Sequence, residues 1–202
     1  MIITEIRKIA AMHERKLYLL AGCNGAGKTT AAFTLLPEVF SCLEFINADE
    51  IARGLSPLQP ETVSMEAGRI MLNRIDSMIS SGKNFAFETT LATGVHHRTI
   101  IAAKEKGYTV TLLFFWLESV KLAKERVMTR VQEGGHNIPP DVIDRRYRRG
   151  IERLFSTYLP VVDHAFIIDN SFGQCTLIAQ QSGDGVLAVT DAPRLNLLKG
   201  HL

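Results

Sequence analysis

One eight-residue stretch carries the clearest chemical signal in this sequence. Residues 22–29 read Gly-Cys-Asn-Gly-Ala-Gly-Lys-Thr, which fits the phosphate-binding pattern G-x-x-x-x-G-K-[ST]. The glycines let successive backbone N–H groups point at one anion. In this pattern Lys28 reaches the β- and γ-phosphates of a nucleotide, and the Thr29 hydroxyl holds Mg²⁺. The stretch therefore predicts a site for ATP or GTP together with Mg²⁺.

The flanking residues stand in the order that this motif needs. An apolar run at 17–21 precedes it and a helix-like stretch at 30–36 follows it, so the loop would join a strand to a helix. Cys23 occupies a variable position, at which the backbone matters more than the thiol. The residues expected to bind the nucleotide are Gly22, Cys23, Asn24, Gly25, Ala26, Gly27, Lys28, Thr29 and Thr30.

Two acidic residues follow expected strands elsewhere in the chain. Asp49 comes after a short strand predicted at 42–46, and Glu88 ends a strand predicted at 84–88. Phosphoryl transfer to an alcohol needs a group that orients the hydroxyl and takes its proton, and Asp49 is the predicted base. The alternative is that Asp49 only caps a helix beginning near Glu50, which is itself the weaker candidate for the base.

Glu88 closes an otherwise apolar strand, where an unpaired charge is costly. It is expected either to bind Mg²⁺ through water or to contact the phosphate acceptor, with a solvated strand end as the alternative. Thr90 offers a hydroxyl to a polar substrate. His136 follows a glycine pair and could touch phosphate or substrate, although an ordinary loop histidine is an equal alternative. Glu88, Thr90 and His136 are the predicted substrate-binding residues.

Seven arginines lie between residues 126 and 153. Arg126 and Arg130 are four residues apart, so they share one face of a helix predicted at 119–133. A guanidinium can stabilise charge on a transferring phosphoryl group, and the Gly134–Gly135 pair would let a lid at about 126–149 close. Lys28, Asp49, Arg126 and Arg130 are therefore the predicted catalytic residues. The alternative for the arginine-rich segment as a whole is a solvated basic face.

Composition narrows the class of protein. The 202 residues fit a single domain, with 46% apolar residues, enough for a sizeable core. The formal net charge of +2 makes a nucleic-acid partner unlikely. Three cysteines, an odd number without close pairing, argue against a disulfide framework or a zinc site and favour a reduced, cytoplasmic setting. The chain shows neither a signal-peptide pattern nor an apolar run long enough to span a membrane.

Strand and helix patterns alternate, which predicts an α/β fold with a mostly parallel sheet. Ligands of such sheets bind beyond the carboxyl ends of the strands, where the loop, Asp49 and Glu88 would meet. A hairpin at about 174–191 is expected at the sheet edge. The expected strands are 16–21, 42–46, 84–88, 108–117 and 165–169, and the expected helices are 30–36, 60–81, 95–106, 119–133 and 141–158.

Four stretches together resemble the zeta-toxin-like P-loop kinases: residues 22–29, 46–50, 87–93 and 126–139. The resemblance covers about residues 16–170. It implies a P-loop NTPase fold like that of nucleoside monophosphate kinases, with parallel strand order 2-3-1-4-5, flanking helices and a small helical lid. It also implies transfer of phosphate from ATP or GTP to a small hydroxylated molecule. Zeta toxins act on the sugar 3′-hydroxyl of UDP-N-acetylglucosamine, with the acid matching Asp49 as base and the acid matching Glu88 in the acceptor pocket.

The chain departs from that family pattern in two places. Zeta toxins carry an arginine in an E-G-T-G-R-T stretch, where this chain has Ala92. The second lid arginine has no unique counterpart, because His136 falls near it. The resemblance therefore supports nucleotide binding more strongly than a UDP-sugar acceptor. An antitoxin partner is possible, although no stretch of the chain resembles an antitoxin.

Two other functions remain open at the level of sequence. A nucleotide-dependent switch or NTPase would use the same phosphate loop but would phosphorylate no small molecule. A polynucleotide kinase would act on RNA or DNA ends. The near-neutral charge weighs against that second alternative, because nucleic-acid affinity draws on many basic contacts.

Overall fold

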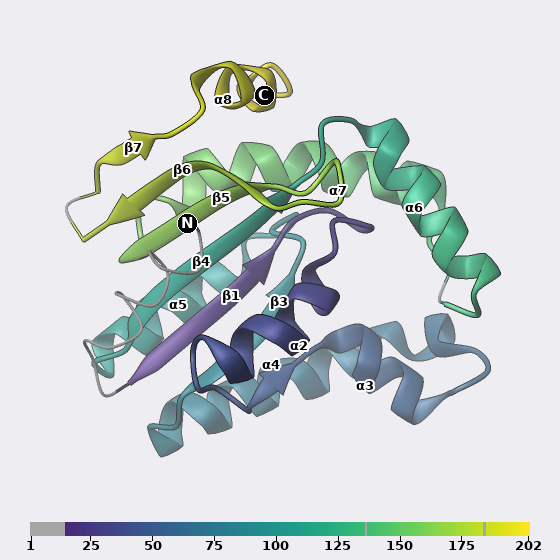
Figure 1. Ribbon diagram of the computed structural model, residues 1–202. Coiled ribbons are helices and arrows are strands. Elements are labelled where there is room, and N and C mark those ends of the chain that lie inside the picture. The colour runs from purple at the N-terminus through teal and green to yellow at the C-terminus, as the bar shows by residue number, and fades with distance from the viewer. Residues whose placement is uncertain (1–14, 136, 184) are drawn as a thin grey trace.

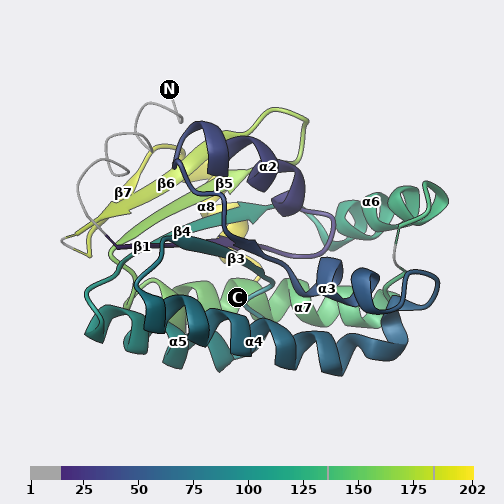
Figure 2. The ribbon, with the colours of Figure 1, turned by 90° about the horizontal axis from the view of Figure 1, so that it is seen from below.

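The computed structural model describes residues 15–135, 137–183 and 185–202. Their core is a seven-stranded sheet of order β2-β3-β1-β4-β5-β6-β7, flanked by helices on both faces (Figures 1 and 2). The first five strands are mutually parallel, and β6 and β7 are antiparallel additions at one edge. The predicted α/β fold and the strand order 2-3-1-4-5 are confirmed. The strands are β1 (Lys16–Ala21), β2 (Phe45–Ile46), β3 (Phe85–Thr89), β4 (Thr109–Trp116), β5 (His164–Asp169), β6 (Thr176–Ser182) and β7 (Leu187–Val189).

The apolar sequence of the central strands explains why they are central. Every residue of β4 after Thr109 is buried, as are the five residues of β1 after Lys16. Parallel strands covered on both faces need such continuous apolar runs. At the carboxyl ends of the strands, the phosphate loop follows β1 and Asn47 follows β2, and Glu88 is the second-last residue of β3.

The helices form two layers and an outlying pair. Helix α2 (Lys28–Glu38) covers one face, and α4 (Ser64–Ser81), α5 (Val95–Glu105) and α7 (Pro140–Arg153) cover the other (Figure 2). Helices α3 (Ala48–Leu55) and α6 (Val120–Gln132) extend beyond the carboxyl ends of the parallel strands (Figure 1). A last helix, α8 (Ala192–Lys199), buries Leu195 and Leu198. No helix formed by the described residues is both long and apolar enough to span a bilayer.

Three predicted elements need correction. The strand expected at 42–46 shrinks to Phe45–Ile46, because the backbone N–H of Cys42 bonds to Leu36 at the end of α2. The helix expected from Pro60 opens as a 3₁₀ turn (η1, Pro60–Val63), since the Gln59 carbonyl accepts from both the N–H and the hydroxyl of Thr62.

The third correction concerns the long helix expected at 141–158. It divides into α7 and a π-helical turn (η2, Leu154–Tyr158), in which the Leu159 N–H bonds five residues back to Leu154. The Tyr158 hydroxyl donates to the Thr93 carbonyl at 2.6 Å, which fixes this turn against the segment that follows β3.

Candidate active site

The phosphate loop is held in place from below by the neighbouring strands. Gly22 has φ 137°, and a Cβ at this position would lie 2.1 Å from the carbonyl oxygen of Phe115 in β4. Side chains of other types are therefore excluded by both conformation and space. On the other side of the loop, the Asn170 amide donates to the Ala26 carbonyl at 2.9 Å. The loop thus packs without a gap against β4 and the residue that follows β5.

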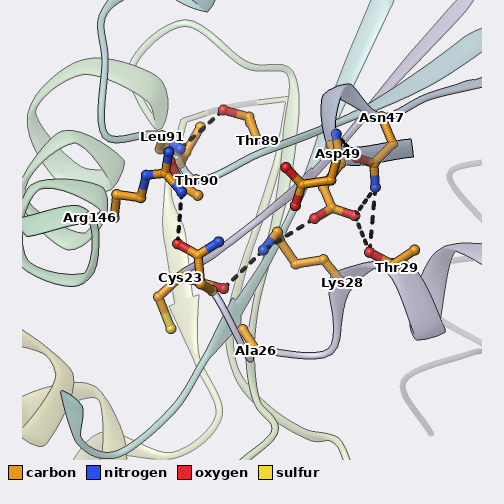
Figure 3. A network of polar contacts seen from close by, with 12 residues as sticks. Cys23, Ala26, Lys28, Thr29, Asn47, Asp49, Thr89, Thr90, Leu91 and Arg146 are labelled. Carbon is orange, nitrogen blue, oxygen red and sulfur yellow. Dashed lines mark hydrogen bonds and ion pairs between the residues drawn. The ribbon is translucent and has the colours of Figure 1, made fainter. Parts of the chain in front are cut away.

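Lys28, Thr29, Asn47 and Glu88 form one compact polar network (Figure 3). Lys28 Nζ lies 2.9 Å from the Cys23 carbonyl oxygen and 3.3 Å from Glu88 Oε1. Thr29 donates its hydroxyl to Glu88 Oε2 at 2.6 Å, and the Asn47 amide donates to the same oxygen at 3.0 Å. The Glu88 side chain is only 12% exposed, so it is a paired, largely buried carboxylate and not a solvated strand end.

Asn47 also decides how Asp49 is presented. Its side-chain oxygen caps α3 by accepting from the backbone N–H groups of Asp49 and Glu50, at 2.8 and 3.4 Å. Asp49 therefore lies in the first turn of α3 and does not cap it, contrary to the alternative considered from sequence. Glu50 forms an exposed ion pair with Arg53 at 3.2 Å. The carboxylate of Asp49 is left to face the site.

Two cavities meet at these residues. The first, which we call the P-loop pocket, measures about 240 Å³. The second, the Arg146 pocket, measures about 190 Å³. Asn24, Asp49 and Glu88 line both, so the two cavities share a wall. The P-loop pocket is completed by Gly25, Gly27, Lys28, Thr29, Thr30, Glu50, Arg53, Arg126 and Arg130; the Arg146 pocket is completed by Asn47, Ala48, Met71, Thr89, Thr90, Thr93, His96 and Arg146.

Both arginines singled out from sequence line the P-loop pocket. They lie on α6, which begins after Ser119, whose hydroxyl oxygen accepts from the Leu122 N–H at 3.1 Å. Arg126 donates to the Ser171 carbonyl at 2.8 Å, beyond the end of β5. This bond connects α6 to the same segment that supports the phosphate loop.

The other predicted residues divide into lining and supporting positions. Thr30 lines the P-loop pocket and Thr90 the Arg146 pocket, whereas Gly22, Cys23 and Ala26 line neither. Burial raises the pKa of the Cys23 thiol to about 11, so the thiol stays protonated and only the carbonyl contributes. All three cysteines are free. His136 lies outside the described residues.

Two titratable residues that line the Arg146 pocket, Arg146 and His96, were not predicted from the sequence. Arg146 projects from α7 and donates to the Asn24 side-chain oxygen at 3.2 Å. Burial lowers the pKa of Arg146, while the nearby Asp49 acts in the opposite direction. His96, in the first turn of α5, packs on the Phe87 ring at a centroid distance of 4.7 Å. Burial lowers its pKa to about 4, so the imidazole is neutral at pH 7.

The position of α7 against this pocket is set by close packing. Gly150 lies one turn after Arg146, and a Cβ there would be 2.6 Å from the Thr90 carbonyl oxygen. The Tyr147 hydroxyl donates to the Leu117 carbonyl at 2.6 Å and accepts from the Trp116 indole at 3.1 Å. In the sequence, the sign of this face of α7 is Gly150, a residue without a side chain that lies one turn after Arg146.

The donor set around Thr29 suits Mg²⁺. Thr29 Oγ1 and Glu88 Oε2 lie 2.6 Å apart at the floor of the P-loop pocket. Mg²⁺ takes few protein oxygens and completes its shell with water and substrate phosphates. The described residues contain no cluster of three or more His, Cys, Asp or Glu side chains that could hold a metal by themselves, so a Mg²⁺ here would depend on a bound nucleotide.

Solved structures share the fold of this chain. The chain superposes on the AvrRxo1-ORF1:AvrRxo1-ORF2 complex with sulphate ions at TM-score 0.72 and 18% identity, covering 97% of this chain and 66% of that one. It also superposes on the PezAT toxin–antitoxin system of Streptococcus pneumoniae at TM-score 0.65 and 18% identity, covering 99% and 93%. This chain thus spans about two thirds of the AvrRxo1 chain.

An uncharacterized protein of Haemophilus influenzae is 28% identical over 142 residues, which are 70% of this chain and 99% of that protein. The family model named Zeta toxin matches residues 3–171 and includes the phosphate loop, Asp49, Glu88 and both helices of the arginine-rich segment. The chain belongs to the Zeta toxin family.

Proposed function

We propose that this chain is an ATP- or GTP-dependent phosphotransferase that moves the γ-phosphate to a hydroxyl of a small molecule. The observation that carries the proposal is the pair of cavities sharing Asp49 and Glu88. A phosphate donor in the P-loop pocket and an acceptor in the Arg146 pocket would have their reacting atoms at this common wall. A related AvrRxo1-ORF1:-ORF2 complex contains ATP, which supports ATP as the donor.

At the donor side, backbone N–H groups of the loop would hold the phosphates, and Lys28 would turn from Glu88 toward them. Thr29 and Glu88 would hold Mg²⁺, whose charge would neutralise the β- and γ-phosphate oxygens when it is bound. Arg126 and Arg130 would stabilise charge on the transferring group from above. We assign the lid over this pocket to α6, since α7 is packed against Leu117 and Thr90.

At the acceptor side, Asp49 is the proposed general base. The acceptor hydroxyl oxygen forms a bond to the γ-phosphorus, the bond from that phosphorus to the β–γ bridging oxygen breaks, and the nucleoside diphosphate leaves. The hydroxyl proton passes to the Asp49 carboxylate. Because Asn47 caps α3, Asp49 is free for this task. A UDP-sugar is one member of the acceptor class, and the PezAT relative makes an antitoxin partner a reasonable proposal as well.

The decisive experiment is transfer of labelled γ-phosphate in the presence of Mg²⁺ to a panel of sugars, nucleosides, UDP-sugars and small hydroxy acids. Asp49→Asn should lower the transfer rate by about 10²- to 10⁴-fold while nucleotide binding persists. Asp76→Asn, on the exposed face of α4, is the matched control and should leave transfer unchanged. Release of inorganic phosphate alone, at a rate indifferent to Asp49, would instead favour the nucleotide-dependent switch.

A further inference from the structure

We propose that the phosphate acceptor carries an anionic group in addition to its hydroxyl, and that Arg146 binds this group. The inference rests on the proposed function and names the class of its substrate: a hydroxylated carboxylate or phosphate ester. In this arrangement, Arg146 binds the anionic group of the acceptor, and the acceptor hydroxyl lies at Asp49.

The first step is the state of Arg146 itself. It is half-buried, and no carboxylate of the described residues lies within 4.0 Å of its guanidinium nitrogens. Its hydrogen bond to Asn24 uses one of five N–H groups. A guanidinium withdrawn from water is favoured by an anion that it can bind through two parallel hydrogen bonds. The neighbouring Arg145, Arg148 and Arg149 are exposed, so Arg146 alone of these faces the cavity.

The second step is the charge around the cavity. His96 lines it but is only 9% exposed and stays neutral, so Arg146 is the single cation among the described residues of this wall. His96 Nδ1 is buried with no hydrogen-bond partner among those residues, which is rare for a buried polar atom. The first turn of α5, which carries His96, has no side-chain cap on its N–H groups and favours negative charge nearby.

The third step concerns the orientation of the acceptor in the cavity. Asp49 and Glu88 also line the cavity, and Glu88 is already compensated by Lys28 at 3.3 Å. Asp49 would repel an anion, so an anionic acceptor is stable only with its charge at Arg146 and its hydroxyl toward Asp49. This orientation brings the hydroxyl to the wall shared with the P-loop pocket, where transfer requires it.

The fourth step is size. A cavity of about 190 Å³ is smaller than the roughly 300–1,000 Å³ typical of pockets that enclose drug-sized ligands. It suits a molecule of the size of a hydroxy acid or a single sugar phosphate. A nucleotide sugar has the same anionic chemistry but would extend outside the cavity.

The test measures binding of matched probes by calorimetry, with a non-hydrolysable ATP analogue and Mg²⁺ saturating the P-loop pocket so that anions cannot bind there. The probes are glycerol, glycerate and glycerol 3-phosphate; glucose, glucuronate and glucose 6-phosphate; and UDP-N-acetylglucosamine. At least one charged probe should bind ten times or more tightly than its neutral partner. Which probe binds separates a carboxylate, a monophosphate and a nucleotide sugar as the source of the charge.

Variants of arginines in α7 then test which residue causes the preference for charged probes. Arg146→Gln should reduce the charged-over-neutral preference about 10- to 100-fold, as expected for a charge-assisted pair of hydrogen bonds. Arg146→Lys, which keeps the charge but not the planar fork, should give an intermediate loss and covers the case in which the glutamine variant folds poorly. Arg149→Gln removes the same charge from the exposed face of α7 and should leave the preference intact.

The inference is overturned if no charged probe binds better than its neutral partner, or if Arg146→Gln and Arg149→Gln behave alike. It is also overturned if Arg146→Gln lowers kcat equally for charged and neutral acceptors without raising KM, because Arg146 would then act on the transferring phosphate. Arg146-dependent binding without phosphate transfer would support the inference and refute the kinase. Asp49-dependent phosphorylation of neutral acceptors would do the reverse.

Discussion

The P-loop pocket and the Arg146 pocket differ in the parts of the chain that form them. One contiguous stretch, residues 22–30, supplies half of the P-loop pocket, and its shape is set by backbone conformation and by packing against β4. The Arg146 pocket instead collects side chains from β3, α3, α4, α5 and α7. Under the proposed function this difference is expected, because phosphates are alike in every nucleotide and suit a fixed backbone cradle, whereas acceptors differ and would be selected by side chains.

The largest expected effect tests whether the phosphate loop is fixed by backbone packing. Gly22→Ala should lower the free energy of unfolding by about 3 kcal/mol or more, because a Cβ would lie 2.1 Å from the Phe115 carbonyl oxygen in a backbone conformation that alanine rarely adopts. Gly107→Ala, also at positive φ but with no atom within 4 Å, should cost only about 1 kcal/mol. If urea unfolding showed the same loss for both variants, contact with β4 would not be what fixes the shape of the phosphate loop, and the contrast between the two pockets would fail.

A middle-sized effect belongs to the buried imidazole of the Arg146 pocket. Burial lowers the pKa of His96 from 6.5 to about 4, so the unfolded chain binds a proton between these values that the folded chain does not. Stability from this residue is therefore present above about pH 6.5 and is lost as the pH falls toward 4. The loss should amount to about 1–3 kcal/mol.

The measurement is urea unfolding at several pH values between 4 and 7. His96→Asn should remove this part of the pH dependence, whereas the less buried neighbour variant His97→Asn should retain it. An unchanged pH dependence in His96→Asn would mean that His96 titrates normally and adds positive charge to the pocket.

The smallest expected effect concerns a single hydroxyl. Thr90→Val should raise the acceptor KM about three- to tenfold, the loss of one ordinary hydrogen bond, and leave the nucleotide KM unchanged. The melting temperature should fall only slightly, because the bond that Thr90 Oγ1 accepts from the Ala92 N–H is long, at 3.5 Å. Thr34→Val, on the exposed side of α2, is the matched control. A change in the nucleotide KM would show that the two pockets are not separable at Thr90.

Features encoded locally could be predicted, and those that depend on packing between distant elements could not. The strand at 16–21 and the polar residues near the ends of β1, β2 and β3 follow from short patterns, whereas the strand order was implied by the family resemblance. Arg146 could not be chosen among seven arginines, because sequence does not give the rotation of α7 about its axis. His96 could not be singled out either, since only the fold brings Phe87 against it.

The break at Leu154 has the same origin. Residues 141–158 have a continuous helical pattern, and nothing in their own order marks a π turn. The constraint comes from Thr93, sixty-five residues earlier in the chain, whose carbonyl holds the Tyr158 hydroxyl. A hydrogen bond across that sequence separation has no local signal.

The close contact between Gly150 and the Thr90 carbonyl oxygen fixes the position of α7 along the pocket. With Tyr147 tied to the end of β4 as well, α7 is a rigid template whose register along the pocket is set before any ligand arrives. Exchange of the single residue at position 146 therefore alters the charge that the template presents without moving the backbone around it. Under the proposed function, exchange of this one residue would change the acceptor preference, and the hydrogen bond from Arg146 to Asn24 is the point at which the exchange would reach the phosphate loop.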